Sequence, residues 1–535
     1  MIRWGRVGST GMRRLAMALL AVVAVSAAAD TLTVRTIDGK LHGKLINHDK
    51  VRAFQGIPYA APPVGKLRWQ PPRREEHWKG TFEATKYGRH CAQNHVFADM
   101  IFQDSTSPDD PGSEDCLTLN VYTPATATSK SKLPVMFWIH GGGYAGGGSS
   151  EPRHDGDFLP LKGVVLVTIN YRLGVFGFLT LPQLSAEQDG TSGNYGLMDM
   201  VQALQWVQEN ISGFGGDPKN VTIFGESAGS FAVSTLMAVP SAQGLFAKAI
   251  GESGGALSSG TLAMPTGDAQ AEKDEKLMED LHVATLEQLR AVPADAVLAT
   301  VAKDRSLRFA PVVDGRFIPE PIVQIYVKGK QAHVPLLAGF NRDEGSFLGK
   351  GMTAAKWKDF ATAHFGDDAA TFLRLYPATD DAVAQRSAAD YGGDAFIAYG
   401  TWKWIEFHRK TGESPVYRYK LDLGAPPSKF HPDPVAFHSD DIEYVFGTLA
   451  TRPGAVWRPE DWKLSDQMMT YWTNFAKTGN PNGEGVPQWP EYGEGDPVLH
   501  LDNPISSRPD ENRPRYEWWL EQEEKAATTA RPQGH

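Results

Sequence analysis

The sequence predicts an α/β fold with a mostly parallel central sheet and helices on both faces. Two observations lead to this class. Short apolar runs rich in β-branched residues recur along the chain, and amphipathic helical segments lie between some of them. The runs are apolar at successive positions, as in strands buried on both faces. In chain order, the predicted strands are Leu133–Ile139, Val164–Ile169, Val221–Phe224, Phe246–Ile250, Val334–Gly339 and Val416–Leu421.

The clearest helix is predicted over Leu197–Ile211. Its apolar residues recur at the three- and four-residue spacing that places them on one helical face; they are Leu197, Met200, Val201, Leu204, Val207 and Ile211. A last helix is expected around Tyr516, and residues 521–535 are expected to be a frayed tail.

The first 29 residues resemble a secretion signal peptide. Four arginines and no acid occur up to Arg14, an apolar run follows over Leu15–Val25, and small residues precede Asp30. This order is typical of a signal peptide, and the run is shorter than the roughly 20 residues that span a bilayer. We therefore expect cleavage between Ala29 and Asp30, export to the periplasm or the medium, and no stable membrane insertion.

Charge and cysteine content exclude several classes of protein. The chain has 53 basic and 63 acidic residues, a net charge of −10, and no long Lys/Arg block, so nucleic-acid binding is not expected. Its two cysteines cannot form a four-Cys zinc site, and no H-E-x-x-H motif occurs, so no metal is expected. Export would place Cys91 and Cys116 in an oxidising compartment, where they can pair.

The best candidate nucleophile is Ser227. The motif G-x-S-x-G occurs twice, over 225–229 and over 251–255, and the pattern alone is weak. A nucleophile elbow joins a strand to a helix. Ser227 follows the predicted strand VTIF, and once past Gly229 the chain continues as a long segment without Gly or Pro, whereas the residues after Ser253 break helices. Ser253 is therefore interpreted as a turn residue, placed near the site.

A serine nucleophile also needs oxyanion donors, a base and an acid. The glycines after His140 follow a predicted strand, so the N–H groups of Gly142 and Gly143 are expected to form an oxyanion hole with that of Ala228. The residues alone leave the base open among four histidines and the acid open between two neighbours. The candidates are His333, His408, His431 and His438 for the base, and Asp343 and Glu344 for the acid.

Ordered blocks of sequence resemble the type-B carboxylesterase family of α/β-hydrolases, including bacterial para-nitrobenzyl esterases. The resemblance runs from about Leu41 to Tyr516, nearly the whole chain after the signal peptide, and indicates one domain over 30–520. The blocks are FQGIPYAAPPVGKLRWQPP, SEDCLTLNVYTP, WIHGGGYAGG, NYRLGVFGFL, NYGLMDMVQALQWVQENISGFGGDPKNVTIFGESAGS, PVVDG, AGFNRDEGSF and FHSDDIEYVFG.

The resemblance implies roles that the residues alone leave open. It implies Glu344 as catalytic acid and His438 as base, with the Cys91–Cys116 pair as the family's first disulfide. It also matches Glu226 to a family position beside the nucleophile, where an acid can stabilise the imidazolium or only satisfy local groups. The loop between the cysteines lacks the tryptophan with which cholinesterases hold choline, so a choline ester is not the expected substrate.

The expected function is cofactor-free hydrolysis of a small-molecule carboxylic ester. Ser227, His438 and Glu344 would act through an acyl-enzyme. One alternative is hydrolysis of amides, lactones or polyester fragments on the same three residues. Another is a non-catalytic binding protein of cholinesterase-like fold, which the presence of all three residues disfavours. The sequence makes no prediction of oligomeric state.

Overall fold

The computed structural model describes Met1 and residues 32–94, 112–258, 262–304, 306–427 and 432–529. Its centre is an eleven-stranded sheet of order β14-β13-β12-β11-β10-β9-β7-β8-β6-β4-β3. All pairs from β8 to β13 are parallel, and the pairs at the two ends are antiparallel. The strands are β3 (Lys44–Ile46), β4 (Val51–Pro58), β6 (Thr118–Pro124), β7 (Leu133–Ile139), β8 (Val165–Ile169), β9 (Gly216–Glu226), β10 (Lys248–Glu252), β11 (Leu336–Asn341), β12 (Val416–Leu421), β13 (Pro497–Leu501) and β14 (Ser506–Pro509).

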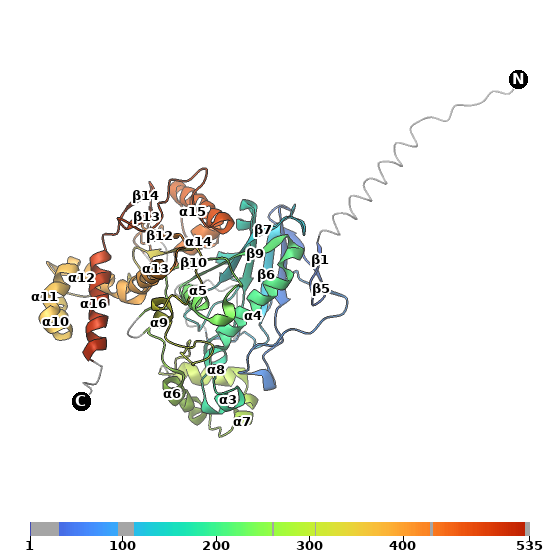
Figure 1. Cartoon of the computed structure of the whole chain (residues 1–535), viewed down its shortest axis with the longest axis horizontal. Helices are drawn as coiled ribbons and strands as arrows, with labels where there is room; N and C mark the ends of the chain where they lie inside the picture. The colour runs from blue at the N-terminus through green and yellow to red at the C-terminus, as the bar shows by residue number, and fades with distance from the viewer. Residues whose placement is uncertain (2–31, 95–111, 259–261, 305, 428–431, 530–535) are drawn as a thin grey trace.

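Helices cover both faces of this sheet, so the predicted fold class is confirmed (Figure 1). Strand β7 shows why: Val135, Phe137 and Ile139 enter the core shared with α4 (Tyr195–Asn210) and α5 (Ala228–Ala238). The alternate residues Met136 and Trp138 enter the second core, with α14 (Asp441–Phe446) and α15 (Pro459–Thr478). Because side chains alternate along a strand, a run that is apolar throughout requires such cover on each side.

Other helices lie around the central sheet, and residues from some of them line the cavity of the candidate active site. One group lies at the end of the molecule away from the N-terminus: α10 (Ala354–Phe365), α11 (Ala369–Leu375), α12 (Asp381–Gly393) and α16 (Arg513–Thr529) (Figure 1). The remaining elements are α2 (Gly174–Phe178), α3 (Pro182–Glu187), α6 (Gly267–Asp280), α7 (Leu286–Ala291), α8 (Ala294–Lys303), α9 (Ile322–Val327), α13 (Tyr399–Thr411) and a small sheet of β1 (Thr33–Arg35), β2 (Lys40–His42) and β5 (Thr81–Glu83).

The largest differences from the predicted boundaries are at the start of β9 and the end of α16. Strand β9 begins at Gly216, five residues before the predicted start at Val221, because Gly216 pairs with Leu133 of β7 across a register shift. Helix α16 continues beyond residue 520, where a frayed tail was expected. Ion pairs to Lys403 of α13 and, over 2.6 Å, to Asp368 hold its last turns through Glu523 and Lys525.

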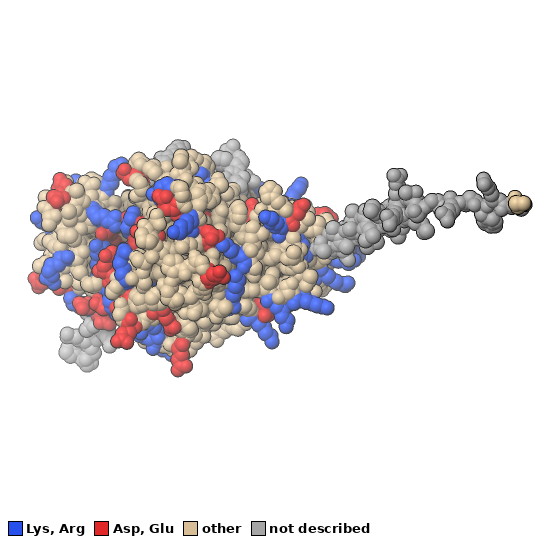
Figure 2. Space-filling view, turned by 90° about the horizontal axis from the view of Figure 1, so that it is seen from above, with Lys and Arg blue, Asp and Glu red and all other residues tan. Residues whose placement is uncertain are grey.

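The face seen in Figure 2 carries both signs of charge. Acidic and basic side chains are interspersed over the body of the molecule, and basic side chains gather at the end beside the N-terminus. Within the described residues, no helix has both the length and the apolar character needed to cross a bilayer. The predicted signal peptide, residues 1–29, lies outside the described residues except for Met1.

Candidate active site

Ser227 lies at the sharp turn between β9 and α5. Its φ is 53° and its ψ is −121°, a conformation that non-glycine residues rarely adopt. The turn passes very close to the end of β7: a Cβ on Gly229 would lie 2.0 Å from the carbonyl oxygen of Ile139. This close approach explains why the motif requires glycine there, and it places the serine hydroxyl at the carboxyl end of the sheet.

The structure brings Ser227, His438 and Glu344 together. The Oγ of Ser227 lies 2.8 Å from Nε2 of His438, and Nδ1 of His438 lies 2.7 Å from Oε2 of Glu344. Glu344 follows β11, and His438 lies in the loop before α14. All three line one cavity. A hydroxyl, an imidazole and a buried carboxylate in this order can transfer the serine proton to the histidine.

The other described candidates for base and acid have other partners. The Nε2 of His408, on α13, is 2.9 Å from the carbonyl oxygen of Val334, and burial lowers the His408 pKa to about 4. His333 is near the carbonyl of Gly329, over 3.0 Å. His431 lies outside the described residues. The carboxylate of Asp343 contacts two arginines and a backbone N–H, whereas that of Glu344 contacts His438.

The second G-x-S-x-G motif also forms a tight turn. Ser253 follows β10 with a φ of 54°, close to that of Ser227, but no helix begins there. Its Oγ donates a 2.6 Å hydrogen bond to Oε1 of Glu344. The N–H of Asn341 donates to the same oxygen over 2.8 Å. Ser253 therefore helps to fix the carboxylate that faces His438.

The glycine loop after β7 lines the same cavity as Ser227. Gly142 and Gly143 have φ values of 101° and 61°, and both line the cavity with Ser227 and Ala228. A Cβ on Gly142 would lie 2.1 Å from the carbonyl oxygen of Gly146, so the loop excludes any side chain at that position. Glycine backbone can thus present its N–H groups to a substrate oxygen.

Buried carboxyl groups surround the imidazole. Glu226 is fully buried, its Oε1 lies 3.4 Å from Nε2 of His438, and burial raises its pKa to about 8. Burial lowers the pKa of His438, but the carboxylates of Glu226 and Glu344 outweigh this effect and raise it to about 9. Burial also raises the pKa of two further acids, that of Glu252 well above its ordinary value and that of Asp441 to about 6. The site therefore favours a positive imidazolium and raises the pKa of the acids around it.

Comparisons with known proteins decide the family. The carboxylesterase family matches residues 30–519. Fumonisin B1 esterase of Sphingopyxis macrogoltabida is 34% identical over 514 residues, which are 91% of this chain and 90% of the relative. Liver carboxylesterase 1 of Oryctolagus cuniculus is 35% identical, over 86% of this chain and 87% of the relative. The chain belongs to the carboxylesterase family.

Solved structures agree with this family assignment. A carboxylesterase of Geobacillus stearothermophilus superposes with a TM-score of 0.78 at 31% identity, covering 91% of this chain and 100% of that one. A PNB esterase superposes with a TM-score of 0.77 at 34% identity, covering 91% of this chain and 99% of that one. The fold is thus the α/β-hydrolase fold of carboxylic ester hydrolases, as the sequence blocks predicted.

The cavity of this carboxylesterase is large. Its volume is about 2180 Å³, well above the roughly 300–1,000 Å³ of a common ligand pocket. Near His438 its wall is aromatic, with Phe347, Phe396 and Phe437. Elsewhere the wall is charged, with Arg342, Arg386 and Lys420 among the residues that line it. Among the described residues, no three His, Cys, Asp or Glu side chains gather as metal ligands would.

The predicted disulfide between Cys91 and Cys116 is present. The residues just after Cys91 line the cavity. The side chain of Gln93 exchanges two hydrogen bonds with the backbone of Gly147, of 2.8 and 2.9 Å. The disulfide-closed segment is thus tied to the glycine loop that carries Gly142 and Gly143.

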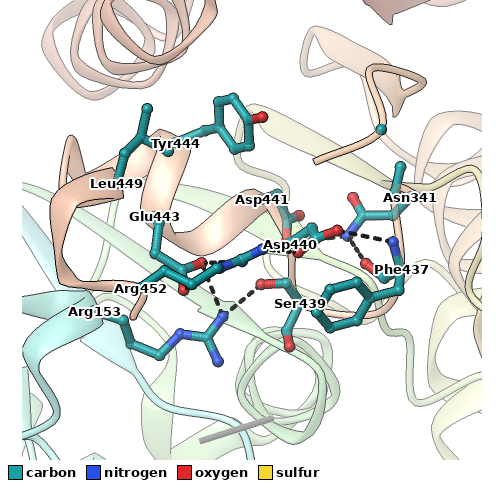
Figure 3. A network of polar contacts seen from close by, with 12 residues as sticks. Arg153, Asn341, Phe437, Ser439, Asp440, Asp441, Glu443, Tyr444, Leu449 and Arg452 are labelled. Atoms are coloured by element: carbon teal, nitrogen blue, oxygen red, sulfur yellow. Dashed lines mark hydrogen bonds and ion pairs between the residues drawn. The ribbon is translucent and has the colours of Figure 1, made fainter. Parts of the chain in front are cut away.

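The sequence patterns did not reveal a polar network that anchors the histidine loop (Figure 3). Arg153 donates to the carbonyl oxygen of Ser439 over 2.6 Å and to Glu443 over 3.1 Å. Arg452 donates to Asp440 over 2.6 Å and to Glu443 over 2.9 Å. Burial alone would raise the pKa of Glu443, but the two arginines lower it to about 2, so Glu443 is ionised. These partners are up to 290 residues apart in the chain, and no local pattern indicates them.

Proposed function

We propose that this protein is a serine carboxylesterase that hydrolyses carboxylic esters through an acyl-enzyme, with Ser227, His438 and Glu344 as its catalytic residues. The unbroken hydrogen-bonded series from Ser227 Oγ through His438 to Glu344 supports this proposal most directly. No cofactor enters the proposed reaction, which uses side chains, backbone N–H groups and water.

In the first half-reaction, Ser227 Oγ bonds to the ester carbonyl carbon while His438 Nε2 takes the hydroxyl proton. The N–H groups of Gly142, Gly143 and Ala228 hold the resulting oxyanion. The carbon–oxygen bond to the alcohol then breaks, and His438 returns the proton to the leaving alcohol. The acyl group remains on Ser227.

In the second half-reaction, water attacks the acyl-enzyme. His438 takes a proton from the water as its oxygen bonds to the acyl carbon, and then returns that proton to Ser227 as the carboxylic acid leaves. Glu344 orients the imidazole and stabilises its positive form throughout, and Ser253 holds Glu344 in place. Glu226, when ionised, adds a second negative group next to the imidazolium.

The volume of the cavity favours an ester larger than a short alkyl acetate. A cavity of about 2180 Å³ with Ser227 in its wall leaves room for bulky groups. A panel of esters that vary the acyl group and the alcohol separately would define this preference, with rates rising from small to bulky groups on at least one side.

The experiment that tests the function combines labelling and turnover. Wild-type protein is expected to react with a fluorophosphonate probe at Ser227 and to hydrolyse a nitrophenyl ester, and Ser227→Ala is expected to do neither. Failure of the wild type to react with the probe would support the alternative of a non-catalytic binding protein. Turnover by Ser227→Ala at the wild-type rate would show that another residue is the nucleophile.

We also propose that residues 1–29 direct export and are removed, leaving a single hydrolase domain over 30–520 with its C-terminal helix. The apolar run and the small residues before Asp30 support this. N-terminal sequencing of protein secreted by a bacterial host would be expected to begin at Asp30. Protein that retains Met1 in the exported fraction would contradict it.

A further inference from the structure

Asp343, the residue before Glu344, has its own set of partners. Its side chain is 4% exposed. Oδ2 accepts from the backbone N–H of Ala436 over 3.0 Å and from Nη2 of Arg342 over 2.7 Å. Oδ1 accepts from Nη1 of Arg386 over 2.7 Å. The carboxylate therefore faces the segment that leads to His438, two residues before the histidine.

The backbones of the two loops are joined at the same point. The N–H of Asp343 donates to the carbonyl oxygen of Ala436 over 2.8 Å, so these two residues exchange two hydrogen bonds. Beside them, the side-chain amide of Asn341 donates to the carbonyl oxygen of Phe437 over 2.8 Å (Figure 3). The loop that carries Glu344 and the loop that carries His438 are thus hydrogen-bonded to each other one or two residues before these side chains.

Asp343 is suited to this attachment at any working pH. Burial would raise its pKa, but Arg342, Arg386 and the N–H of Ala436 outweigh burial and hold the pKa below its ordinary value. The carboxylate therefore stays ionised and remains a strong acceptor. The two guanidinium groups also offset the negative charge of Asp343. Asp343 therefore affects the imidazole of His438 mainly through the position of the loop rather than through its charge.

The attachment extends to helix α12. Arg386, on α12, bridges Asp343 and Asp390, with both distances at 2.7 Å. The helix also packs directly on the acid loop, because a Cβ on Gly345 would lie 2.0 Å from the carbonyl oxygen of Ala389. Asp343 is therefore held from one side by α12 and holds the histidine loop on the other.

We propose that Asp343 is a positioning residue that keeps the Glu344 loop and the His438 loop in the register that catalysis requires. The inference rests on the proposed roles of Ser227, His438 and Glu344. Because a displacement of about 1 Å in a catalytic group can cost on the order of 100-fold in rate, one lost attachment so close to His438 has a measurable effect.

The test compares Asp343→Ala with wild type by active-site titration. A fluorophosphonate end-point counts the sites that are intact, and turnover of a nitrophenyl ester is then expressed per titrated site. We expect kcat per site to fall about ten- to a hundredfold, with KM within threefold because the cavity walls remain. A merely structural role would lower the melting temperature and the number of titrated sites but leave kcat per site unchanged.

Asp461→Ala is the matched control. Asp461 is also buried, accepts from the guanidinium of Arg458 over 2.7 Å and accepts from a backbone N–H over 2.7 Å, but it does not line the cavity. This variant is expected to lose stability and to keep the wild-type kcat per titrated site.

A second variant covers the case in which Asp343→Ala does not fold. In Asp343→Asn the amide oxygen can still accept from Ala436, but the amide nitrogen then faces a guanidinium group, so we expect a three- to tenfold loss of kcat per site. A kcat per site within twofold of wild type in Asp343→Ala, or in Asp343→Asn where only that variant folds, overturns the inference alone. Failure of the wild type to be labelled overturns both the inference and the proposed function.

Discussion

The ring of Phe396 packs against the imidazole of His438, with ring centroids 4.9 Å apart and planes inclined at 62°. Phe396 lies on a π-helical turn, Asp394–Ala398, between α12 and α13. Such turns occur frequently at functional sites. Phe347, on the acid loop, packs edge-on against Phe396 at 5.9 Å. In the proposed reaction the histidine protonates the departing alcohol, so we expect this aromatic wall to lie on the alcohol side.

Phe396→Ala is expected to weaken discrimination among alcohols. An aromatic pair contributes about 0.5–1.5 kcal/mol, so KM should rise roughly three- to tenfold for esters of aromatic alcohols and change little for methyl esters of the same acid. Steady-state kinetics with matched aryl and methyl esters measure this difference. An equal change for every alcohol would mean that Phe396 does not contact the alcohol.

Glu226→Gln is expected to move the pH profile toward acid. The proposed base must be neutral, and the pKa of His438 is raised to about 9, so kcat/KM should rise with pH through the neutral and alkaline range. Removing the carboxylate of Glu226 removes one cause of that raised pKa. The imidazole would then lose its proton at lower pH, and the rising limb would shift downward. Profiles of kcat/KM between pH 5 and 10 test this, and an unshifted limb would contradict it.

Gly142→Ala should abolish most activity. A Cβ there would collide with the backbone of Gly146, and a φ of 101° is strained for alanine, so the proposed oxyanion donors would move. Loss of one such donor costs about 100- to 1000-fold in kcat. Gly163→Ala is the control, because Gly163 has a φ of 84° but no atom within 4 Å of the added Cβ. The control should lose some stability and retain kcat, and equal losses in both variants would argue against an oxyanion role.

Removal of the disulfide should lower stability more than activity. The bond joins residues 25 positions apart, and loop-closure entropy corresponds to roughly 3–4 kcal/mol for such a loop. Denaturant unfolding of Cys91→Ser/Cys116→Ser should show a loss of that order. A reductant should destabilise the wild type and leave the double variant unchanged. A wild-type protein that is indifferent to reductant would show that the bond adds little.

Much of the fold and site could be predicted because the signals are local. The strand VTIF, the elbow at Ser227 and the glycines after His140 are short patterns that can be interpreted from the segments directly beside them. The choice between Asp343 and Glu344 could not be made locally, because both follow the same strand and differ only in where their side chains point. Only the family resemblance indicated Glu344, and the structure shows its carboxylate 2.7 Å from His438.

Other features depend on contacts between distant segments. The π-helical turn under Phe396 carries no sequence signature, and Arg153 reaches Glu443 only through the tertiary fold. The end of α16 was missed for a similar reason. Its polar last turns look like a tail in the sequence, but ion pairs to Lys403 and Asp368 hold them as helix.

The turns after β9, β10 and β11 are neighbours because the three strands pair in order. Gly251 of β10 lies opposite Gly225 of β9 on one side and opposite Ala338 of β11 on the other. Neighbouring strands are fixed about 4.8 Å apart, so the segments that carry Ser227, Ser253 and Glu344 cannot shift independently. Much of the cavity wall, in contrast, comes from α6, α8, α12 and the π-helical turn, which lie outside the sheet. This arrangement suggests where to engineer the protein: libraries confined to α6 and α8 can change which esters are accepted, because these helices line the cavity but do not carry Ser227, His438, Glu344 or the partners of Asp343.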